Sequence, residues 1–381
     1  MVRPARYVSI APGALGTVQQ RGYGYEYLLE AARSGLSARE AASIMEEFDS
    51  MDLAQAADRL TLEVAGDTVT FVNNLVVNYT NVCVAGCKIC AFYRPPGHPE
   101  GYVRSPEEVA RLVARSVAEY GITELHINGG FHPDLGPEYF DELFGAVKAA
   151  SPGVAIKGLT AAEVEFYSRV WRMSYREVLD RLRMAGMDAL SGGGAEILDD
   201  GVRRVIAPYK FDAEKWLRVQ EEAHEVGIPT NATMLYGHIE EPRHIVEHIS
   251  KVRDLQRKLR GVLTFIPVKF VPWNTELMRD GLVRGPAPPE LDIKVAAISR
   301  LMLAGEVPRI SAYWVSIGRR MASVLLLSGA NDLVGTMINE SVLRSAGSGE
   351  SASLEELAHI AREVGRRPVQ RDTFQRALRE L

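Results

Sequence analysis

The chain has 381 residues, of which 46% are hydrophobic and 24% are charged, so it holds enough apolar material for a large core. Its formal net charge of −5 argues against a broad surface for nucleic acid or for an anionic membrane. There is no apolar stretch of the secretory kind in the N-terminal MVRPARYVSIAPG, and no run reaches the roughly 20 apolar residues of a membrane span. We therefore expect a protein of the cytoplasm.

The N-terminal part of the chain is predicted to be helical. Apolar residues recur at three- and four-residue spacing over residues 25–34 and 38–60, and Ser37 is a plausible N-cap of the second stretch. Residues 60–72, LTLEVAGDTVTFV, then alternate apolar and polar residues around a Gly-Asp pair, which predicts a β-hairpin. We assign residues 1–72 to a helical extension with a short hairpin.

From residue 74 onward, short β-branched runs alternate with polar loops and amphipathic helices. The predicted strands cover residues 75–80, 123–129, 153–160, 187–192, 228–237, 262–270, 309–318 and 325–332. Such alternation predicts an α/β fold with a parallel (β/α)8 barrel of the TIM type over residues 73–347, with a doubly wound open sheet as the alternative. Residues 348–381 are expected to form a helical tail packed on the barrel.

The three cysteines of the chain, Cys83, Cys87 and Cys90, follow the first predicted barrel strand with the spacing C-x3-C-x2-C. A structural zinc site would need a fourth ligand, such as His98. A thioredoxin-like C-x-x-C pair would leave Cys83 unexplained. A [4Fe–4S] cluster would keep one iron without a protein ligand, and that iron could chelate the amine and carboxylate of S-adenosylmethionine (SAM).

This spacing after a first barrel strand resembles the motif of the radical SAM superfamily. The resemblance implies a [4Fe–4S] cluster on the three cysteines and a bound SAM, whose cleavage releases a 5′-deoxyadenosyl radical. It also implies that SAM is contacted after the second and fourth strands, by Gly129, Gly130, Gly193, Gly194 and Glu196. An ordinary βα turn and a carboxylate at a helix N-terminus are the structural alternatives for these residues.

Two positions depart from the superfamily pattern. Ile89 stands where an aromatic residue usually lies near the adenine, so Tyr93 or Phe92 is expected to make that contact instead. Phe131 replaces the carboxylate that usually follows the glycine pair. These departures concern SAM and leave the cluster prediction unchanged.

Two other patterns suggest zinc enzymes. His244, Glu247 and His248 match the H-x-x-E-H pattern of a metalloprotease class, but the apolar stripe of this predicted helix would leave both histidines in solvent. His238 and Glu240 echo the zinc deaminase motif, which needs a downstream C-x-x-C that this chain lacks. Neither hypothesis explains the cysteines.

The resemblance narrows beyond the cluster motif. Segments such as VNYTNVCVAGCKICAFYR, GGFHPDLGPEYF and GANDLVGTMINESV look like the enzymes that build menaquinone by the futalosine route and like the tyrosine-using half of deazaflavin (FO) synthase. Residues 156–166, 230–240 and 312–318 are more similar to aminofutalosine synthase, and residues 91–103 to the cyclic dehypoxanthinyl futalosine cyclase. We therefore expect the synthase, with the cyclase and the FO synthase subunit as alternatives.

The synthase resemblance implies that the 5′-deoxyadenosyl radical adds to the enol ether of 3-[(1-carboxyvinyl)oxy]benzoate. The products would be 6-amino-6-deoxyfutalosine, methionine and CO2 or bicarbonate. Because this aromatic substrate has two carboxylates, cations or hydrogen-bond donors should face it from the strand ends. The candidates are His132, Lys157, Asn231, Thr233, His238, Lys269 and Tyr313. The cluster also implies a flavodoxin- or ferredoxin-like electron donor.

Overall fold

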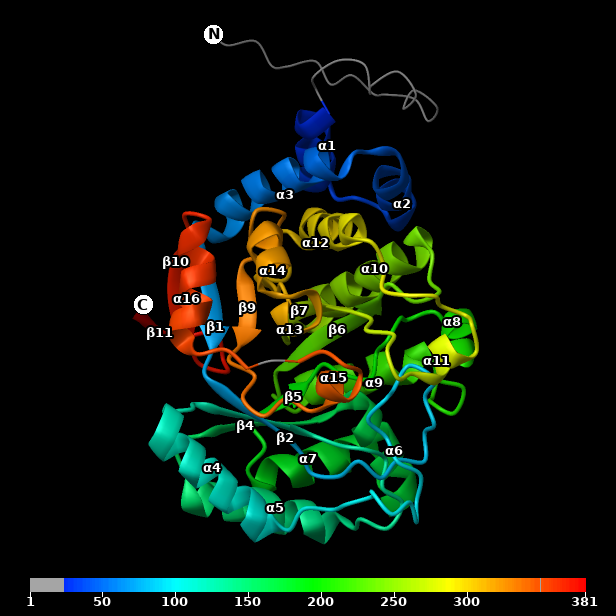
Figure 1. Ribbon diagram of the computed structural model, residues 1–381, viewed down its shortest axis with the longest axis vertical. Helices are drawn as coiled ribbons and strands as arrows, with labels where there is room; N and C mark the ends of the chain where they lie inside the picture. Colours follow the sequence, from blue (N-terminus) through cyan, green and yellow to red (C-terminus); the bar gives the residue numbers. More distant parts are fainter. Residues whose placement is uncertain (1–23, 350) are drawn as a thin grey trace.

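The computed structural model describes residues 24–349 and 351–381 (Figure 1). The first 23 residues of the predicted extension therefore lie outside the described residues. Three helices follow: α1 (Gly24–Ser34), α2 (Ala38–Glu47) and α3 (Ser50–Ala65). Ser37 caps α2 as predicted, but the single helix expected over residues 38–60 is wrong, because α2 ends at the extended residue Phe48 and Asp49 then caps a new helix, α3.

The hairpin predicted over residues 60–72 is also wrong. Helix α3 continues through most of this stretch and ends at Gly66, whose φ of 69° suits a residue without a side chain. Only β1 (Thr68–Val72) is a strand, and it pairs in parallel with β9 (Asp332–Gly335) and β10 (Arg367–Arg371). The apolar residues of this stretch fit the helical period as well, and their packing against outer helices of the barrel favours the helix.

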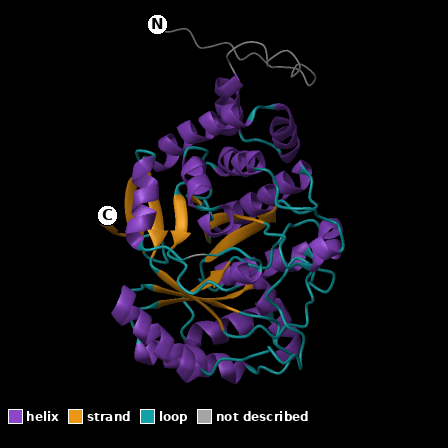
Figure 2. Ribbon diagram, viewed as in Figure 1, coloured by secondary structure: helices purple, strands orange, loops and turns teal. Residues whose placement is uncertain are grey.

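The centre of the molecule is a parallel sheet of seven strands in the order β2-β3-β4-β5-β6-β7-β8, surrounded by helices (Figure 2). The strands are β2 (Asn74–Asn78), β3 (Glu124–Asn128), β4 (Ala155–Thr160), β5 (Ala189–Ser191), β6 (Thr230–Tyr236), β7 (Val262–Lys269) and β8 (Arg309–Ile310). Strands in simple chain order are typical of a TIM-type barrel, whereas a doubly wound sheet reverses its order. The predicted fold class is therefore confirmed.

The helices between and after these strands vary in length. The longer ones are α4 (Pro106–Tyr120), α5 (Pro137–Ala150), α6 (Ala161–Trp171), α7 (Tyr175–Ala185), α9 (Ala213–Glu225), α10 (Pro242–Leu259) and α12 (Pro289–Leu303). The shorter ones are α8 (Asp200–Ile206), α11 (Glu276–Arg279), α13 (Trp314–Ile317), α14 (Arg319–Leu326) and α15 (Val342–Ser345). Among the described residues, no helix combines the length and apolar character needed to cross a bilayer.

The eighth strand predicted over residues 325–332 is wrong, because this leucine-rich run completes α14 and a turn. The ring is closed by the segment that follows. Isolated bridges pair Asp332 with Ser311 beyond β8, and Ile338 with Leu75 on β2. The strand expected over residues 309–318 is likewise reduced to β8, since its second half forms α13.

A second sheet, in the order β11-β10-β1-β9, lies beside the barrel (Figure 1). The tail over residues 348–381, predicted to be helical, contains α16 (Leu354–Glu363) but also β10 and β11 (Ala377–Glu380). Because β1 lies between β9 and β10, this sheet joins the start of the barrel to the C-terminal end of the chain. The domain boundaries at residues 72 and 347 stay predictions.

Candidate active site at the mouth of the barrel

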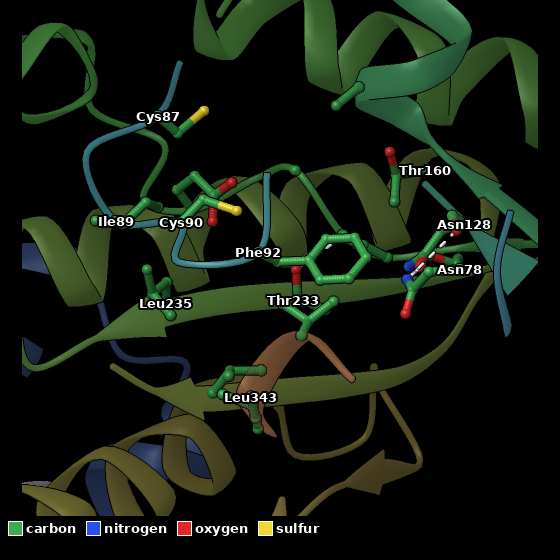
Figure 3. Close-up of a pocket in the computed structure, with 18 of the residues that line it drawn as sticks. Asn78, Cys87, Ile89, Cys90, Phe92, Asn128, Thr160, Thr233, Leu235 and Leu343 are labelled. Atoms are coloured by element: carbon green, nitrogen blue, oxygen red, sulfur yellow. Dashed lines mark hydrogen bonds between the residues drawn. The ribbon is translucent and has the colours of Figure 1, made fainter. Parts of the chain in front are cut away.

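A cavity of about 350 Å³ opens at the C-terminal ends of the barrel strands. Figure 3 shows the sulfur atoms of Cys87 and Cys90 at one side of this cavity, Phe92 near its centre, and Asn78 and Asn128 at the other side. Cys83 also lines it. The loop after β2 thus brings all three predicted metal ligands to one cavity, where the chemistry of a TIM-type barrel is expected.

Arg94 organises the cysteine loop, a role that the sequence did not reveal. Its Nη1 donates to the carbonyl oxygens of Ala91, Phe92 and Tyr93. Its backbone carbonyl accepts from the amide of Cys83 at 2.9 Å, and its Nε bonds Glu100 at 2.7 Å. One side chain therefore fixes the turn that presents Cys90 to the cavity.

The cysteines fit a [4Fe–4S] cluster better than a single metal ion. Among the described residues, no three His, Cys, Asp or Glu side chains converge on one metal position, and His98 instead accepts from the amide of Glu100. The fourth ligand suggested for a structural zinc site, His98, therefore does not face the cavity with the cysteines. A cluster binds each thiolate through a different iron, so the sulfur atoms can be spread around the cavity wall. Burial raises the pKa of the Cys87 thiol to about 12, and a bound metal centre would lower it again by compensating the charge of the thiolate.

Gly129 and Gly130 lie where the end of β3 meets the cysteine loop. A Cβ atom on Gly130 would lie 2.2 Å from the carbonyl oxygen of Val82 and 2.9 Å from the Cβ of Cys83. A Cβ on Gly129 would lie 2.8 Å from the ring of Tyr79. Both positions therefore require glycine, which lets the cysteine loop lie against the barrel, and the contact of this pair with SAM stays a prediction.

A carboxylate lies beside the glycine pair even though Phe131 follows it in the chain. The Oε1 atom of Glu163 accepts from the amide of Gly129 at 2.9 Å and from the hydroxyl of Tyr79 at 2.7 Å. Its Oε2 accepts from the amide of Thr160 at 2.7 Å, in a capping box that starts α6 directly at the end of β4. Burial raises the pKa of Glu163 to about 7. The Thr-x-x-Glu pattern was the signal that sequence analysis missed.

Glu196 lines the cavity as predicted, paired with a lysine that was not predicted. Its Oε1 lies 2.5 Å from the Nζ of Lys210, and both residues line the wall nearest the cysteines together with Gly193 and Gly194. Burial opposes ionisation of Glu196, but the charge of Lys210 lowers its pKa overall. A Cβ on Gly194, whose φ is 85°, would lie 2.3 Å from the Cβ of Ala162, so this turn also requires glycine.

The predicted substrate residues divide into two groups. The members that line the cavity are Lys157, Asn231, Thr233, Lys269 and Tyr313. His132 and His238 do not line it. The buried ring of His238 turns away to Glu240, with its Nδ1 2.9 Å from the carboxylate. Positions on or just after predicted strands indicated that all seven residues belong to the barrel, but only the direction of each side chain decides which ones face inward.

Sequence analysis also missed several other residues that line the cavity. His126 and the amides Asn78 and Asn128 point inward from β2 and β3, and Leu343 and Ala346 reach the cavity from the chain around α15. Alternation along the barrel strands marks the first three. Nothing local marks Leu343 and Ala346, because they lie more than 260 residues farther along the chain than β2.

The metalloprotease hypothesis is wrong. His248 is buried rather than solvated, and its Nδ1 accepts from the amide of Leu198 at 3.1 Å. The Nδ1 of His244 accepts from the amide of Glu241 at the start of α10. Both imidazoles serve the packing and capping of this helix, and no metal position is formed with Glu247 among the described residues.

Two family descriptions match the chain. The radical SAM superfamily matches residues 77–252, and the CofH/MqnC C-terminal region matches residues 259–380. Among curated relatives, the 5-amino-6-(D-ribitylamino)uracil–L-tyrosine 4-hydroxyphenyl transferase 1 of Methanosarcina barkeri is 39% identical over 93% of this chain and 94% of its own. The aminodeoxyfutalosine synthase of Thermus thermophilus is 38% identical over 93% of this chain and 95% of its own.

Solved structures agree on the fold. Methylornithine synthase has 16% identity and a TM-score of 0.68, covering 90% of this chain and 97% of its own. The FeFe-hydrogenase maturase HydG of Carboxydothermus hydrogenoformans has 18% identity and a TM-score of 0.69, covering 91% of this chain and 79% of its own. At these identities the likeness concerns the fold alone.

Proposed function

The chain belongs to the radical SAM superfamily, as an enzyme with a [4Fe–4S] cluster and SAM as cofactors, and from this premise we propose that it is a 4-hydroxyphenyl transferase. Its substrates would be L-tyrosine and 5-amino-6-(D-ribitylamino)uracil. The reaction named for relatives from Methanosarcina, Methanopyrus and Methanothermobacter supports this choice. The expectation of a synthase acting on an enol-ether benzoate is not confirmed.

The charge of the cavity carries this proposal. The lysines that line it are each paired with a buried carboxylate: Lys157 with Glu124 at 2.7 Å, Lys210 with Glu196 at 2.5 Å, and Lys269 with Asp292 at 2.8 Å. In the described part of the cavity, no lysine is therefore left to balance a second substrate carboxylate. A neutral uracil with a ribityl chain and a zwitterionic amino acid suit such a wall better than a dicarboxylate.

The neutral donors and acceptors of the wall suit a ribityl chain. Asn231 and Thr233 project from β6, and Asn78 and Asn128 from the opposite side of the barrel. The Thr233 hydroxyl already donates to the carbonyl of Gly192 at 2.7 Å, which leaves its oxygen free to accept. Amide and hydroxyl groups of this kind exchange hydrogen bonds with a polyol without requiring charge.

The residues near the cysteines would hold the cofactors. When bound, the cluster and SAM supply a 5′-deoxyadenosyl radical. Cys83, Cys87 and Cys90 would bind the cluster, and Glu196 would accept from the ribose hydroxyls while Lys210 holds it in place. Glu163 orients the amide of Gly129 at the site predicted for the methionyl group. The low-potential electron would come from a flavodoxin- or ferredoxin-like donor.

The test is a product analysis on cluster-reconstituted protein under anaerobic conditions with dithionite and SAM. L-Tyrosine labelled with 13C in its ring is supplied together with 5-amino-6-(D-ribitylamino)uracil. We expect cleavage of SAM with release of 5′-deoxyadenosine. We also expect an adduct that carries the 13C label and joins the tyrosine ring to the uracil. If tyrosine is untouched while SAM is cleaved, the transferase assignment fails and only the radical SAM activity stands.

Aminodeoxyfutalosine synthase is the second candidate. The relative from Thermus thermophilus supports it, and so does the stretch TNATMLYGHIE, which forms the β6 wall of the cavity. A parallel incubation with 3-[(1-carboxyvinyl)oxy]benzoate distinguishes the two reactions. The synthase would keep the adenosine within its product, whereas the transferase would leave this benzoate unchanged. Dehypoxanthinyl futalosine in a third incubation tests the cyclase.

A further inference from the structure

The floor of the cavity is one layer of side chains in the middle of the barrel. The strand register pairs Val76 on β2 with His126 on β3, and His126 with Lys157 on β4. All three residues line the cavity. The next layer toward the N-terminal ends of the strands contains Asn74 paired with Glu124. Since inward positions alternate along a strand, the second layer lies directly beneath the floor.

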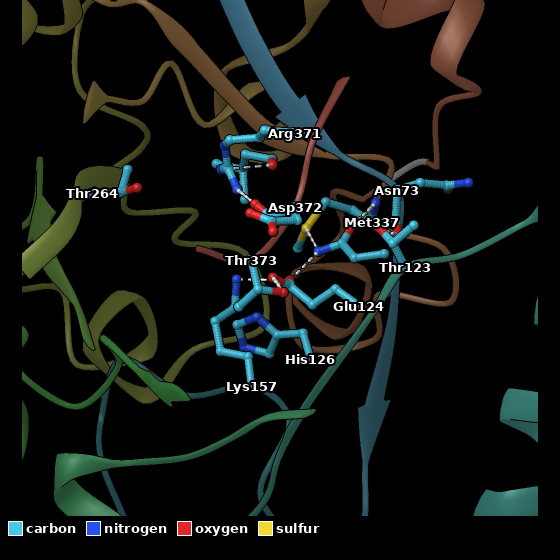
Figure 4. Close-up of polar contacts among 12 residues, drawn as sticks. Asn73, Thr123, Glu124, His126, Lys157, Thr264, Met337, Arg371, Asp372 and Thr373 are labelled. Atoms are coloured by element: carbon cyan, nitrogen blue, oxygen red, sulfur yellow. Dashed lines mark hydrogen bonds and ion pairs between the residues drawn. The ribbon is translucent and has the colours of Figure 1, made fainter. Parts of the chain in front are cut away.

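A buried carboxylate cancels the charge of the lysine in this floor. Glu124 is fully buried, and its Oε1 lies 2.7 Å from the Nζ of Lys157 (Figure 4). Its Oε2 accepts from the hydroxyl of Thr373 at 2.9 Å, and Asn74 donates to its Oε1 at 3.3 Å. Burial opposes ionisation of Glu124, but Lys157 lowers its pKa overall, so the pair is an ammonium and a carboxylate.

Thr373 reaches this position because the C-terminal segment closes the bottom of the barrel. The Nε of Arg371 bonds the carboxylate of Asp332 at 2.9 Å, with both side chains almost fully buried. Gln375 donates to the hydroxyl of Thr264 on β7 at 2.9 Å. These two anchors hold Thr373 between them, so the carboxylate that balances Lys157 receives a hydrogen bond from the turn between β10 and β11.

A chain of hydrogen bonds assigns the tautomer of His126. The Nδ2 of Asn78 donates to the backbone carbonyl of Asn128, which can only accept, and to its Oδ1 at 2.8 Å. The Nδ2 of Asn128 therefore faces the Nε2 of His126 at 3.3 Å and donates to it. The proton of the neutral ring then lies on Nδ1.

The Nδ1 atom of His126 has no partner. It is buried, and no described residue offers it a hydrogen bond. Burial lowers the pKa of His126 to about 4, so the ring is uncharged near neutral pH. A buried donor without an acceptor destabilises a fold, and such a group on a cavity wall indicates that a ligand supplies the acceptor.

We propose that His126 determines the specificity of this floor by donating its Nδ1 hydrogen to an uncharged ring oxygen of the substrate. The ion pair of Glu124 and Lys157, with the hydrogen bond from Thr373, keeps the floor free of net charge. A substrate carboxylate placed there would therefore lose its hydrating water without gaining a cation as a partner. The oxygen is a phenol oxygen or a ring carbonyl, and the proposed function supplies the two sources, tyrosine and the uracil. The inference rests on the proposed function only for the identity of these two substrates.

The test measures binding to reconstituted, SAM-bound protein by calorimetry, with 4-methylphenol, uracil and 4-methylbenzoate as probes. We expect the wild type to bind one of the two uncharged probes about tenfold more tightly than the benzoate. His126→Phe should lose that preference. His126→Asn should keep most of it, because its amide nitrogen can take the place of Nδ1. The variant His359→Phe, at an exposed position on α16, is the control.

Variants beneath the floor test the charge balance separately. Glu124→Gln leaves the charge of Lys157 uncompensated, so benzoate should bind about tenfold more tightly than to the wild type. Thr373→Val should shift the preference in the same direction, and Thr373→Ser should restore it. If His126→Phe does not fold, as judged by circular dichroism and cluster absorbance, the variant His126→Asn decides, and loss of the preference in folded His126→Asn overturns the inference.

The outcomes also separate this inference from the proposed function. Preference of the wild type for benzoate, or an unchanged preference in a folded His126→Phe variant, overturns the role of His126. Tight binding of 4-methylphenol assigns the floor to the tyrosine ring, and tight binding of uracil assigns it to the other substrate. If the uncharged probes are preferred but tyrosine is not converted, the proposed function fails while the role of His126 stands.

Discussion

At Gly130 the barrel and the cysteine loop approach so closely that no side chain fits. Gly130→Ala places a Cβ 2.2 Å from the carbonyl oxygen of Val82, so the loop that carries Cys83 must shift. We expect the variant to retain about half or less of the iron and sulfide of the wild type after reconstitution, as measured by chemical analysis.

Gly145→Ala is the matched control, because a Cβ there meets nothing within 4 Å. Gly145 lies inside α5, so this substitution should raise the free energy of unfolding by about 0.5–1 kcal/mol and leave the cluster content unchanged. Full cluster content in Gly130→Ala would show that the loop does not depend on this contact.

Glu163 should make stability depend on pH. Burial raises its pKa from 4.5 to about 7, so the folded state binds this proton more tightly than the unfolded state. Its contribution is therefore fully present below pH 4.5 and is lost as the pH rises through about 7. Relative to Glu163→Gln, the wild type should lose up to about 3 kcal/mol between these limits. Urea unfolding of both proteins at pH 5 and pH 8 measures this, and a constant difference between them contradicts it.

The residues of the site differ in how far the sequence could predict them. Cys83, Cys87 and Cys90 lie in one loop, so their spacing alone predicts a shared metal centre. Glu163 was missed although its capping box with Thr160 is local, and its contact with Gly129 forms only when β3 and β4 have aligned. Lys210 was missed because no motif marks its pairing with Glu196 in the segment between β5 and β6. Their surroundings, rather than their position in a motif, decide whether such charged groups pair with one another or face a ligand.

Among the elements, β9 is the one that joins the two sheets, and it does so through Asp332. This buried carboxylate accepts from the hydroxyls of Thr70 on β1 and Ser311 beyond β8, both at 2.7 Å, and from Arg371 on β10 at 2.9 Å. Asp332→Asn leaves the buried guanidinium of Arg371 without a compensating charge. We expect it to lower the free energy of unfolding by about 3–5 kcal/mol, measured by urea titration.

Ser311→Ala provides the comparison for this prediction. It removes one hydrogen bond from the same carboxylate but no charge, so its cost should be only about 1 kcal/mol. Replacing both members of the pair, as Asp332→Leu with Arg371→Met, should recover much of the loss, because neither charge is then buried alone. A similar cost for Asp332→Asn and Ser311→Ala would mean that the charge of Arg371 is satisfied elsewhere.

The predicted elements were right where local pattern and tertiary packing agree. Each of the seven barrel strands overlaps a predicted one, although β8 is much shorter than expected, because these strands are mostly buried apolar runs between helices. The hairpin over residues 60–72 and the strand over residues 325–332 were wrong for a shared reason. The strand β1 pairs with β9 and with β10, which lie some 260 to 300 residues farther along the chain, and no local signal records such partners.

At the scale of the whole molecule, both ends of the described chain support the active site. The C-terminal segment supplies Thr373 to the carboxylate beneath the cavity floor, and α15 supplies part of the cavity wall. The strand β1, which precedes the barrel, is held between β9 and β10. The barrel therefore cannot be closed at its N-terminal end by residues of the barrel strands alone.

This closure predicts the effect of shortening the chain. Removing residues 367–381 deletes β10 and leaves β1 without one of its two neighbours. It also removes Thr373 from the buried carboxylate of Glu124 and Arg371 from that of Asp332. We expect such a protein to lose cooperative unfolding in urea, as measured by fluorescence, and to fail to take up the cluster.

Removing only residues 377–381 deletes the exposed edge strand β11 but keeps β10 and Thr373. That shorter deletion should unfold cooperatively and keep its cluster. If the longer deletion also did so, the barrel would be an independent folding unit, and the dependence of its cavity floor on the C-terminal segment would be refuted.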